Sequence, residues 1–263
     1  MSYAVVQGSA SGYTGSVTSH AVTMPSGIVA GEKLIVFFGC SNDVTVNTPS
    51  GWTKGVDGVH PTSLRIVVYT KIAVGGDTLT VTTSSNTIGV NITYRVLTNN
   101  DIEFSSTASG SSINPNPPSL TPAGGSQQYI YFAAALSSGV TFPGYPSNYT
   151  DNQVTNTGGT YDMAVATRSL TSASDDPGTF TMDFSGDWVT CTVSAEPQTP
   201  ASATAPLLTS TSGIFQPTID FAADATFPII EAPSSTVFVP TAYADDSATW
   251  ANESRNTATW TNV

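Results

Sequence analysis

Short apolar and β-branched runs, separated by turn residues, fill most of the first 197 positions of the chain. Lys33–Phe38 is an almost continuous apolar run bounded by glycines, as expected of a strand in a sandwich core, and Leu64–Tyr69 is similar. Thr78–Thr82 and Val90–Val96 alternate apolar and polar positions, which indicates one buried and one solvated face. No apolar 3.6-residue period lasts longer than a turn or two. The pattern therefore predicts an all-β protein.

Five of these strand and turn features occur twice, in the same order. The pairs are Pro25–Phe38 with Pro118–Phe132, Pro49–Thr53 with Pro146–Thr150, Thr70-Lys71 with Thr167-Arg168, Thr78–Val81 with Thr179–Met182, and Val90–Tyr94 with Val189–Val193. Their offsets are 93, 97, 97, 101 and 99 residues. Such constant spacing predicts an internal duplication, with half-repeats at about 20–98 and 113–197.

The duplication allows two arrangements of the chain. The halves are long enough to form two small sandwiches, or they supply the two sheets of a single one. Both halves hold few large apolar residues, and residues 99–117 between them are polar. We therefore expect one jelly-roll-like antiparallel sandwich over residues 1–197, with pseudo-twofold halves.

The composition changes after Glu196. Residues 198–212 are rich in Pro, Ala and Thr, as in an extended linker. Residues 213–263 hold frequent prolines, which exclude helix interiors and central strands and predict an extended arm. A short repeat with a period of ten, Ala-Thr-Trp, closes this segment. The arm's aromatic residues need a surface to cover them, and we expect them to form an assembly interface: Phe215, Phe221, Phe227, Phe238, Trp250 and Trp260.

Charge and composition exclude several classes of function. The 263 residues include only 7 Lys and Arg against 19 Asp and Glu, for a net charge of −12. No basic stripe exists for a phosphate backbone or an anionic membrane surface, so we expect neither nucleic acid nor membrane as a partner. The N-terminal residues carry neither a basic nor an apolar signal region, so synthesis and folding in a cytosol are expected.

Candidate catalytic and metal-binding chemistry is sparse. His20 and His60 have no ligand at metal-binding spacing, so we expect no metal and no cofactor. Cys40 and Cys191 both fall in strand patterns, which favours buried free thiols over a disulfide framework. A Ser/His/Asp triad has no positive signal beyond the number of serines. The Asp175-Asp176-Pro177-Gly178 segment is interpreted as a turn, and the protein is not expected to be an enzyme.

Three aromatic residues in turns are candidates for stacking on a sugar. They are Trp52, Tyr145 and Tyr149, which fall in turns flanked by proline or glycine. The structural alternative is that such rings close the end of a sandwich core. Trp52 and Tyr149 occupy matching positions in the repeat, which favours a shared structural role.

Two motifs in the first half carry a resemblance to a known class of protein. Pro25-Ser26-Gly27-Ile28-Val29-Ala30-Gly31 leads into a strand, and Pro49-Ser50-Gly51-Trp52-Thr53 forms a turn before the strand that ends at Tyr69–Ala73. This pattern resembles a β-sandwich type common in tailed-phage structural proteins, over roughly residues 20–197, although Glu32 stands where Asp is more usual. The Trp250–Trp260 segment also resembles C-terminal tails of phage virion proteins.

The resemblance implies a structural role in a virion. We expect a protein that decorates or cements a capsid, or a collar or tail accessory, synthesised in the host cytoplasm and assembling through residues 213–263. Its partners would be copies of itself and other virion proteins. The alternative is a carbohydrate-binding adhesin that contacts a host glycan through Trp52, Tyr145 and Tyr149. A surface hydrolase ranks third.

Overall fold

The computed structural model describes residues 3–98, 101–155 and 160–197, together with the backbone of 219–220, 236–242 and 247–254. Every regular element in this part of the chain is a β-strand, and no helix occurs in it. The contacts divide the chain into two compact units, Met1–Thr199 and Pro200–Val263. The predicted all-β class is confirmed.

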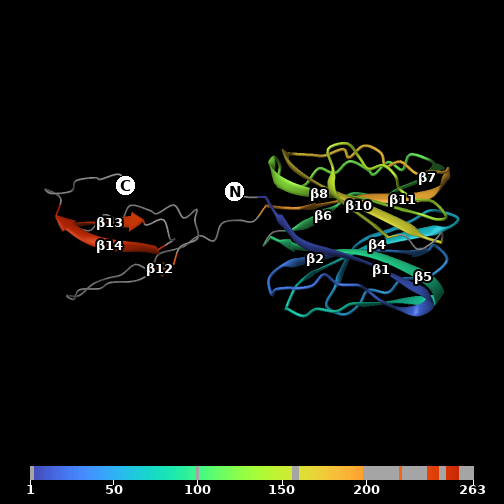
Figure 1. Cartoon of the computed structure of the whole chain (residues 1–263), viewed down its shortest axis with the longest axis horizontal. Coiled ribbons are helices and arrows are strands. Elements are labelled where there is room, and N and C mark those ends of the chain that lie inside the picture. The colour runs from blue at the N-terminus through green and yellow to red at the C-terminus, as the bar shows by residue number, and fades with distance from the viewer. Residues whose placement is uncertain are drawn as a thin grey trace. The chain divides into compact units, whose positions relative to one another are not determined.

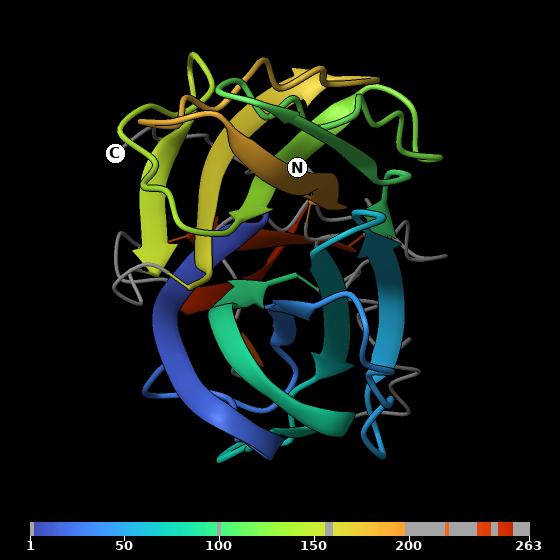
Figure 2. The same cartoon turned by 90° about the vertical axis from the view of Figure 1, so that its right-hand side faces the viewer.

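The first unit is a sandwich of two antiparallel sheets (Figures 1 and 2). The first sheet has the order β1-β5-β2-β4-β3, built from β1 (Val5–Ala21), β2 (Lys33–Ser41), β3 (Thr53–Val59), β4 (Leu64–Ile72) and β5 (Thr80–Leu97). The second has the order β6-β11-β8-β10-β9, with β7 also paired to β11. Its strands are β6 (Ile102–Phe104), β7 (Ala108–Ser112), β8 (Gln127–Ser137), β9 (Thr150–Thr155), β10 (Asp162–Ser172) and β11 (Gly186–Ala195).

Each sheet comes from one half-repeat together with the strands that precede it, since β1, β6 and β7 lie almost wholly before residues 20–98 and 113–197, and the two strand orders are equivalent. The single long strand β1 corresponds to the two short strands β6 and β7, since all three pair with the last strand of their half. One sandwich therefore forms from two halves, one sheet from each. The fold resembles a jelly roll in having two packed antiparallel sheets. The path of the chain differs, because consecutive strands complete one sheet before the chain enters the other.

The strand register corrects one detail of the sequence repeat. Sequence matching aligns Phe38 with Phe132. In the structure, however, Phe132 pairs with Thr167 and Val193. Their counterparts in the first half, Thr70 and Tyr94, pair with Ile35. The match at this strand is therefore wrong by three residues. The reason is that β8 begins earlier than β2 relative to their partners, so the loop before it does not keep the length of its counterpart.

A shared core fills the space between the sheets. Ile35, Phe37 and Tyr94 of the first half are buried against Phe132 of the second, with ring centroids 5.0 Å apart for Tyr94 and Phe132. Because both sheets supply this core, neither half buries its apolar face without the other. This mutual burial explains why the chain forms a single sandwich.

Each sheet also buries its outer face under its own loops. Leu34, Val36 and Phe38 alternate with the shared-core residues of β2 and pack under the loops of the first half. Tyr129 and Tyr131 do the same in the second half. Alternate side chains of a strand point to opposite faces, so strands covered on both sides need apolar residues at almost every position. This explains the continuous apolar runs.

In the second unit the structure describes three antiparallel strands in the order β12-β14-β13: β12 (Ile219–Asp220), β13 (Thr236–Ala242) and β14 (Ser247–Ser254). Phe238 pairs with Asn252, and Pro240 with Trp250. Phe215, Phe221, Phe227 and Trp260 lie outside the described residues. The assembly role of residues 213–263 stays a prediction.

Candidate functional site

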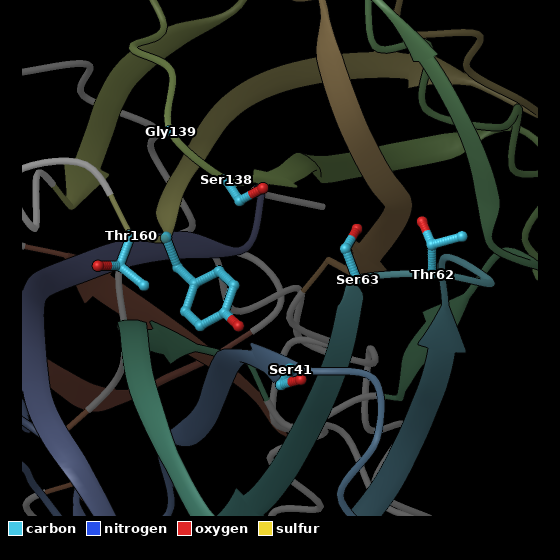
Figure 3. A pocket seen from close by; sticks show the side chains of 7 residues that line it. Ser41, Thr62, Ser63, Ser138, Gly139 and Thr160 are labelled. Atoms are coloured by element: carbon cyan, nitrogen blue, oxygen red, sulfur yellow. The ribbon is translucent and has the colours of Figure 1, made fainter.

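A polar hollow, which we call the end pocket, lies at one end of the sandwich. It has a volume of about 470 Å³ and is lined by Ser41, Thr62, Ser63, Ser138, Gly139, Thr160 and Tyr161. Figure 3 shows that Ser41, Thr62 and Ser63 come from the first sheet and its turns, while Ser138 and Gly139 follow β8 of the second. The end pocket is therefore built by both halves, and six of its seven lining residues carry a hydroxyl group.

The two walls of the end pocket are equivalent parts of the duplication. Ser41 ends β2, and Ser138 directly follows the end of β8, at the same position relative to the neighbouring strand. Thr62 and Ser63 lie between β3 and β4, and Thr160 and Tyr161 precede β10 in the corresponding place. The folding of two copies onto each other thus produces a hollow where their equivalent ends meet.

A polar cluster around Asp187, which we call the Asp187 cluster, adjoins the end pocket. Asp187 Oδ2 accepts hydrogen bonds from Thr62 Oγ1 at 2.8 Å and Ser63 Oγ at 2.9 Å. Its Oδ1 accepts one from Ser111 Oγ at 2.5 Å, and His60 Nδ1 lies 3.3 Å from Oδ2. The hydrogen bond from Ser111 lowers the pKa of Asp187, with those from Thr62 and Ser63 and the charge of His60 adding to it against the effect of burial. The carboxylate therefore joins β11 to the β3–β4 turn of the other half.

The Asp187 cluster contains serine, histidine and aspartate, but its geometry differs from that of a catalytic triad. In a triad one imidazole nitrogen faces the carboxylate and the other accepts the proton of the nucleophile. Here Asp187, Thr62 and Ser63 all gather at His60 Nδ1, and both hydroxyl groups donate to the carboxylate. The hydroxyl groups are held by Asp187 and not by a general base, so this arrangement suits cohesion between the sheets.

Tyr161 is the aromatic residue of the end pocket. Burial raises its pKa, although a hydrogen bond with Ser41 partly offsets that effect. Ser41 Oγ in turn donates to Asp43 Oδ1. The chain of Tyr161, Ser41 and Asp43 therefore links the second half to the first at the end pocket.

Trp52 and Tyr149, two of the predicted glycan contacts, lie in the outer cores, each only 7% exposed. Lys71 Nζ lies 5.8 Å from the centroid of the Trp52 ring and 2.6 Å from Asp77 Oδ1. Neither ring offers an open face to a ligand. The structure gives both aromatic residues the core-closing role that the repeat favours.

The second half repeats this arrangement of an aromatic residue, a base and an acid. The Tyr149 hydroxyl donates to Asp175, and Arg168 Nη1 lies 2.9 Å from the same carboxylate. Burial raises the pKa of Tyr149 above its ordinary value, and the hydrogen bond to Asp175 adds to the shift. Asp175 is therefore a buried partner of Arg168, bridged in the backbone to Leu120, and not merely a turn residue. Tyr145 is half-buried, with its ring 5.9 Å from that of Phe180.

The cysteines and histidines have structural environments. Cys40 lies in the outer core of the first sheet and Cys191 in the shared core, both as free thiols. Burial raises the pKa of each to about 12, so both stay protonated at neutral pH. His20 is buried against Phe38, and burial lowers its pKa. Among the described residues, no three acidic, histidine or cysteine side chains are placed to hold a metal ion.

Comparison with known proteins adds no relative. No protein-family model, curated protein or solved structure matches this chain. The likeness to phage sandwiches therefore depends on the short motifs quoted above. The described residues also include no helix of the length and apolarity needed to cross a bilayer.

Sequence reasoning missed the end pocket and the Asp187 cluster. Ser63, Ser111 and Asp187 are far apart along the chain and belong to no spaced motif. The internal repeat is the sequence feature that could have indicated the end pocket, because equivalent turns of two stacked halves meet at the same end of a sandwich. That inference needs the stacking direction of the sheets, which the sequence pattern does not contain.

Proposed function

We propose that this protein is a non-catalytic structural component of a phage virion, of the capsid-decorating or head–tail accessory type. In this proposal the sandwich of residues 1–197 is the exposed module, and residues 213–263 are the arm that attaches it to other virion proteins. The motifs at Pro25–Leu34 and Pro49–Thr53 supply the link to phage sandwiches. Attachment through an arm suits assembly, because such a segment buries a large surface against its neighbours.

The observation that carries a structural role is the internal use of the basic residues. Of the seven Lys and Arg in the chain, five form ion pairs within the sandwich. Arg95 pairs with Glu32 at 3.1 Å, and Lys71 and Arg168 pair with buried carboxylates. Ion pairs within the sandwich hold loops against sheets. They also leave few Lys and Arg side chains to bind an anionic partner. This supports a rigid scaffold whose surface is mainly hydroxyl-bearing and acidic.

The proposal is tested by incorporation of the chain into phage particles. Replacing Phe215 and Phe227 by Ser should reduce occupancy on purified particles at least tenfold, because the arm loses apolar side chains for its interface. The matched control is Phe184→Ser, since Phe184 is an aromatic residue of the sandwich that is 69% exposed. Wild-type occupancy of the arm variant, or an equal loss in the control, would contradict attachment through the arm.

A second candidate function, glycan binding, is favoured by the lining of the end pocket. The lining carries six hydroxyl groups, and hydroxyl groups form the kind of hydrogen bonds that hold a sugar. This moves the alternative away from Trp52 and Tyr149, which are buried.

Glycan-array binding tests this candidate. Ser138→Leu should abolish the signal because it fills the end pocket, whereas Ser174→Leu, an exposed serine beyond the far end of β10, should leave it unchanged. A blank array with the wild-type protein would exclude the glycan hypothesis for the sugars tested.

A further inference from the structure

Strand β1 is a long, uncharged edge of the first sheet. It runs for 17 residues, pairs along one side with β5, and stands at the end of the strand order. Figure 2 shows it as the dark blue outer strand of that sheet. Its sequence, VVQGSASGYTGSVTSHA, contains no Asp, Glu, Lys, Arg or Pro. The outer backbone amide and carbonyl groups of such an edge are a template for another strand.

The other sheet edges of the described sandwich are short, and most carry charges. β3 has seven residues and includes Lys54 and Asp57, and β9 has six and begins at Thr150-Asp151. β6 has three residues with Glu103 at its centre, and β7 has five. Short length and charged side chains are the usual protections against edge-to-edge pairing. β1 has neither protection.

The duplication supplies an internal comparison for β1. Its counterpart in the second half is interrupted between β6 and β7, so the ladder with β11 is broken there. Phe104 of this half packs over Gly55 of β3, and Thr107 packs over Gly58, so these side chains face the other sheet. Two equivalent edges thus differ in length and in charge.

The middle of β1 is a regular platform for a second strand. Gly8–Thr14 pairs with Gly89–Arg95 without interruption, and irregularities bound this run on either side, at Val6/Gly8 and Thr14/Val17. Ser11 is at its centre and is exposed, and Tyr13 is 52% exposed. The seven paired residues match a usual strand length.

We propose that β1 pairs antiparallel with β1 of a second copy of this chain, about a twofold axis near Ser11. A twofold interface brings the same segment together from both copies, so one strand supplies both sides. Two chains of net charge −12 repel each other, and β1, which holds no acidic or basic side chain other than His20, is the sheet edge at which this repulsion is least. The first sheets of the two copies then form one continuous ten-stranded sheet.

The proposal is independent of the proposed virion role and of residues 213–263. It predicts a dimer in solution through the sandwich itself, whichever larger assembly the arm joins. An assembly made only through the arm would not depend on residues of β1. Substitutions confined to β1 therefore distinguish a dimer made through β1 from an assembly made through the arm.

Light scattering after size exclusion tests the dimer in the full chain. The wild-type protein should have a molar mass of twice 27.2 kDa, and Ser11→Lys should reduce that to a single chain, because like charges would face each other at the axis. Thr53→Lys, an exposed position on the opposite edge of the same sheet, should stay dimeric. A monomeric wild type, or a Ser11→Lys mass equal to that of the wild type, overturns the proposal.

Disulfide trapping gives a second readout that does not depend on weakening the dimer. Ser11→Cys should form a covalent dimer on mild oxidation, since the residue nearest the axis meets its own copy. Thr53→Cys should form none, and Cys40 and Cys191 are buried and should not contribute. Equal cross-linking of both variants would show random collision and would overturn the β1 pairing.

Discussion

Ser63 Oγ donates a 2.9 Å hydrogen bond to Asp187 Oδ2 and so joins the two halves of the duplicated chain. Ser63 lies on the β3–β4 turn of the first half and Asp187 on β11 of the second, 124 residues later. The apolar core between the sheets does not by itself fix their relative alignment, because dispersion and burial are not directional. A directional bond at one end of the sandwich fixes which turns meet there.

Replacing Asp187 by Ala should destabilise the sandwich by about 1–2 kcal/mol, because three hydroxyl groups lose their shared acceptor at a partly exposed site. Urea unfolding at pH 7 measures the loss. Asp176→Ala is the matched control, an exposed aspartate in the same half that should change little. A loss in the control as large as that in Asp187→Ala would remove the special role of the cluster.

The contact between Gly55 and Phe104 predicts a coupled pair of substitutions. A Cβ at Gly55 would lie 2.2 Å from the Phe104 ring, which is too close for any real contact. Gly55→Ala should therefore cost about 1–3 kcal/mol by overpacking, and most of that cost should disappear in a Phe104→Ala background. Gly15→Ala, with no atom within 4 Å of its Cβ, serves as the control. Additive effects in the double-mutant cycle would mean that the two positions do not touch.

Tyr149→Phe should destabilise the second outer core by about 1–3 kcal/mol, because it removes a hydrogen bond to the buried, charged Asp175. Tyr145→Phe removes the same atom from a half-buried neighbouring ring and should be close to neutral. Thermal unfolding compares the two variants directly. Equal midpoints would show that the Tyr149 hydroxyl contributes no net stability.

The Lys71–Asp77 pair predicts a stability loss in acid. Burial would raise the pKa of Asp77, but hydrogen bonds from Lys71 and from the backbone amides of Val74 and Gly75 outweigh it and lower that pKa below 3.8. A carboxylate with a depressed folded-state pKa stabilises the protein above its unfolded-state pKa, and this contribution is lost as the pH falls through the folded value. Wild type should therefore exceed Asp77→Asn in unfolding free energy at pH 6, and the gap should narrow as the pH falls below the ordinary pKa range of an aspartate. A gap independent of pH would contradict the assignment.

Burial of both cysteines predicts their reactivity. A pKa raised to about 12 keeps each thiol protonated, and neither Cys40 nor Cys191 is exposed, so a thiol reagent at pH 8 should label neither in the folded protein. Two labels per chain should appear in denaturant. Rapid labelling of a folded chain would place at least one thiol at the surface.

The sequence pattern predicts the sandwich because the formation of strands and turns depends mainly on residues that are close together in the chain. The turn at Pro49–Thr53 and its copy at Pro146–Thr150 depend on proline and on residues that adopt positive φ, Gly51 at 77° and Asn148 at 66°. Trp52 and Tyr149 match for the same reason, as rings that close equivalent outer cores. These features need only neighbouring residues, so the repeat and the fold class can be read without a structure.

The remaining features depend on long-range geometry. The pairing of Asp175 with Arg168 is hidden in a segment whose local composition indicates only a turn, and the Asp187 cluster draws on three separate strands or turns. The register of β8 was wrong by three residues in the sequence match because loops before equivalent strands differ in length. None of these contacts produces a residue spacing or motif that can be recognised in a single sequence.

The central claim, that this chain is a structural part of a virion, is tested most directly by its presence on particles. Phage particles from cells that produce the protein would be purified by density gradient, and the chain quantified by mass spectrometry against a major capsid protein. The proposal predicts a fixed stoichiometry with the particle peak that survives repeated gradients. Recovery of the protein only in the soluble fraction, with none in the particle peak, would contradict it.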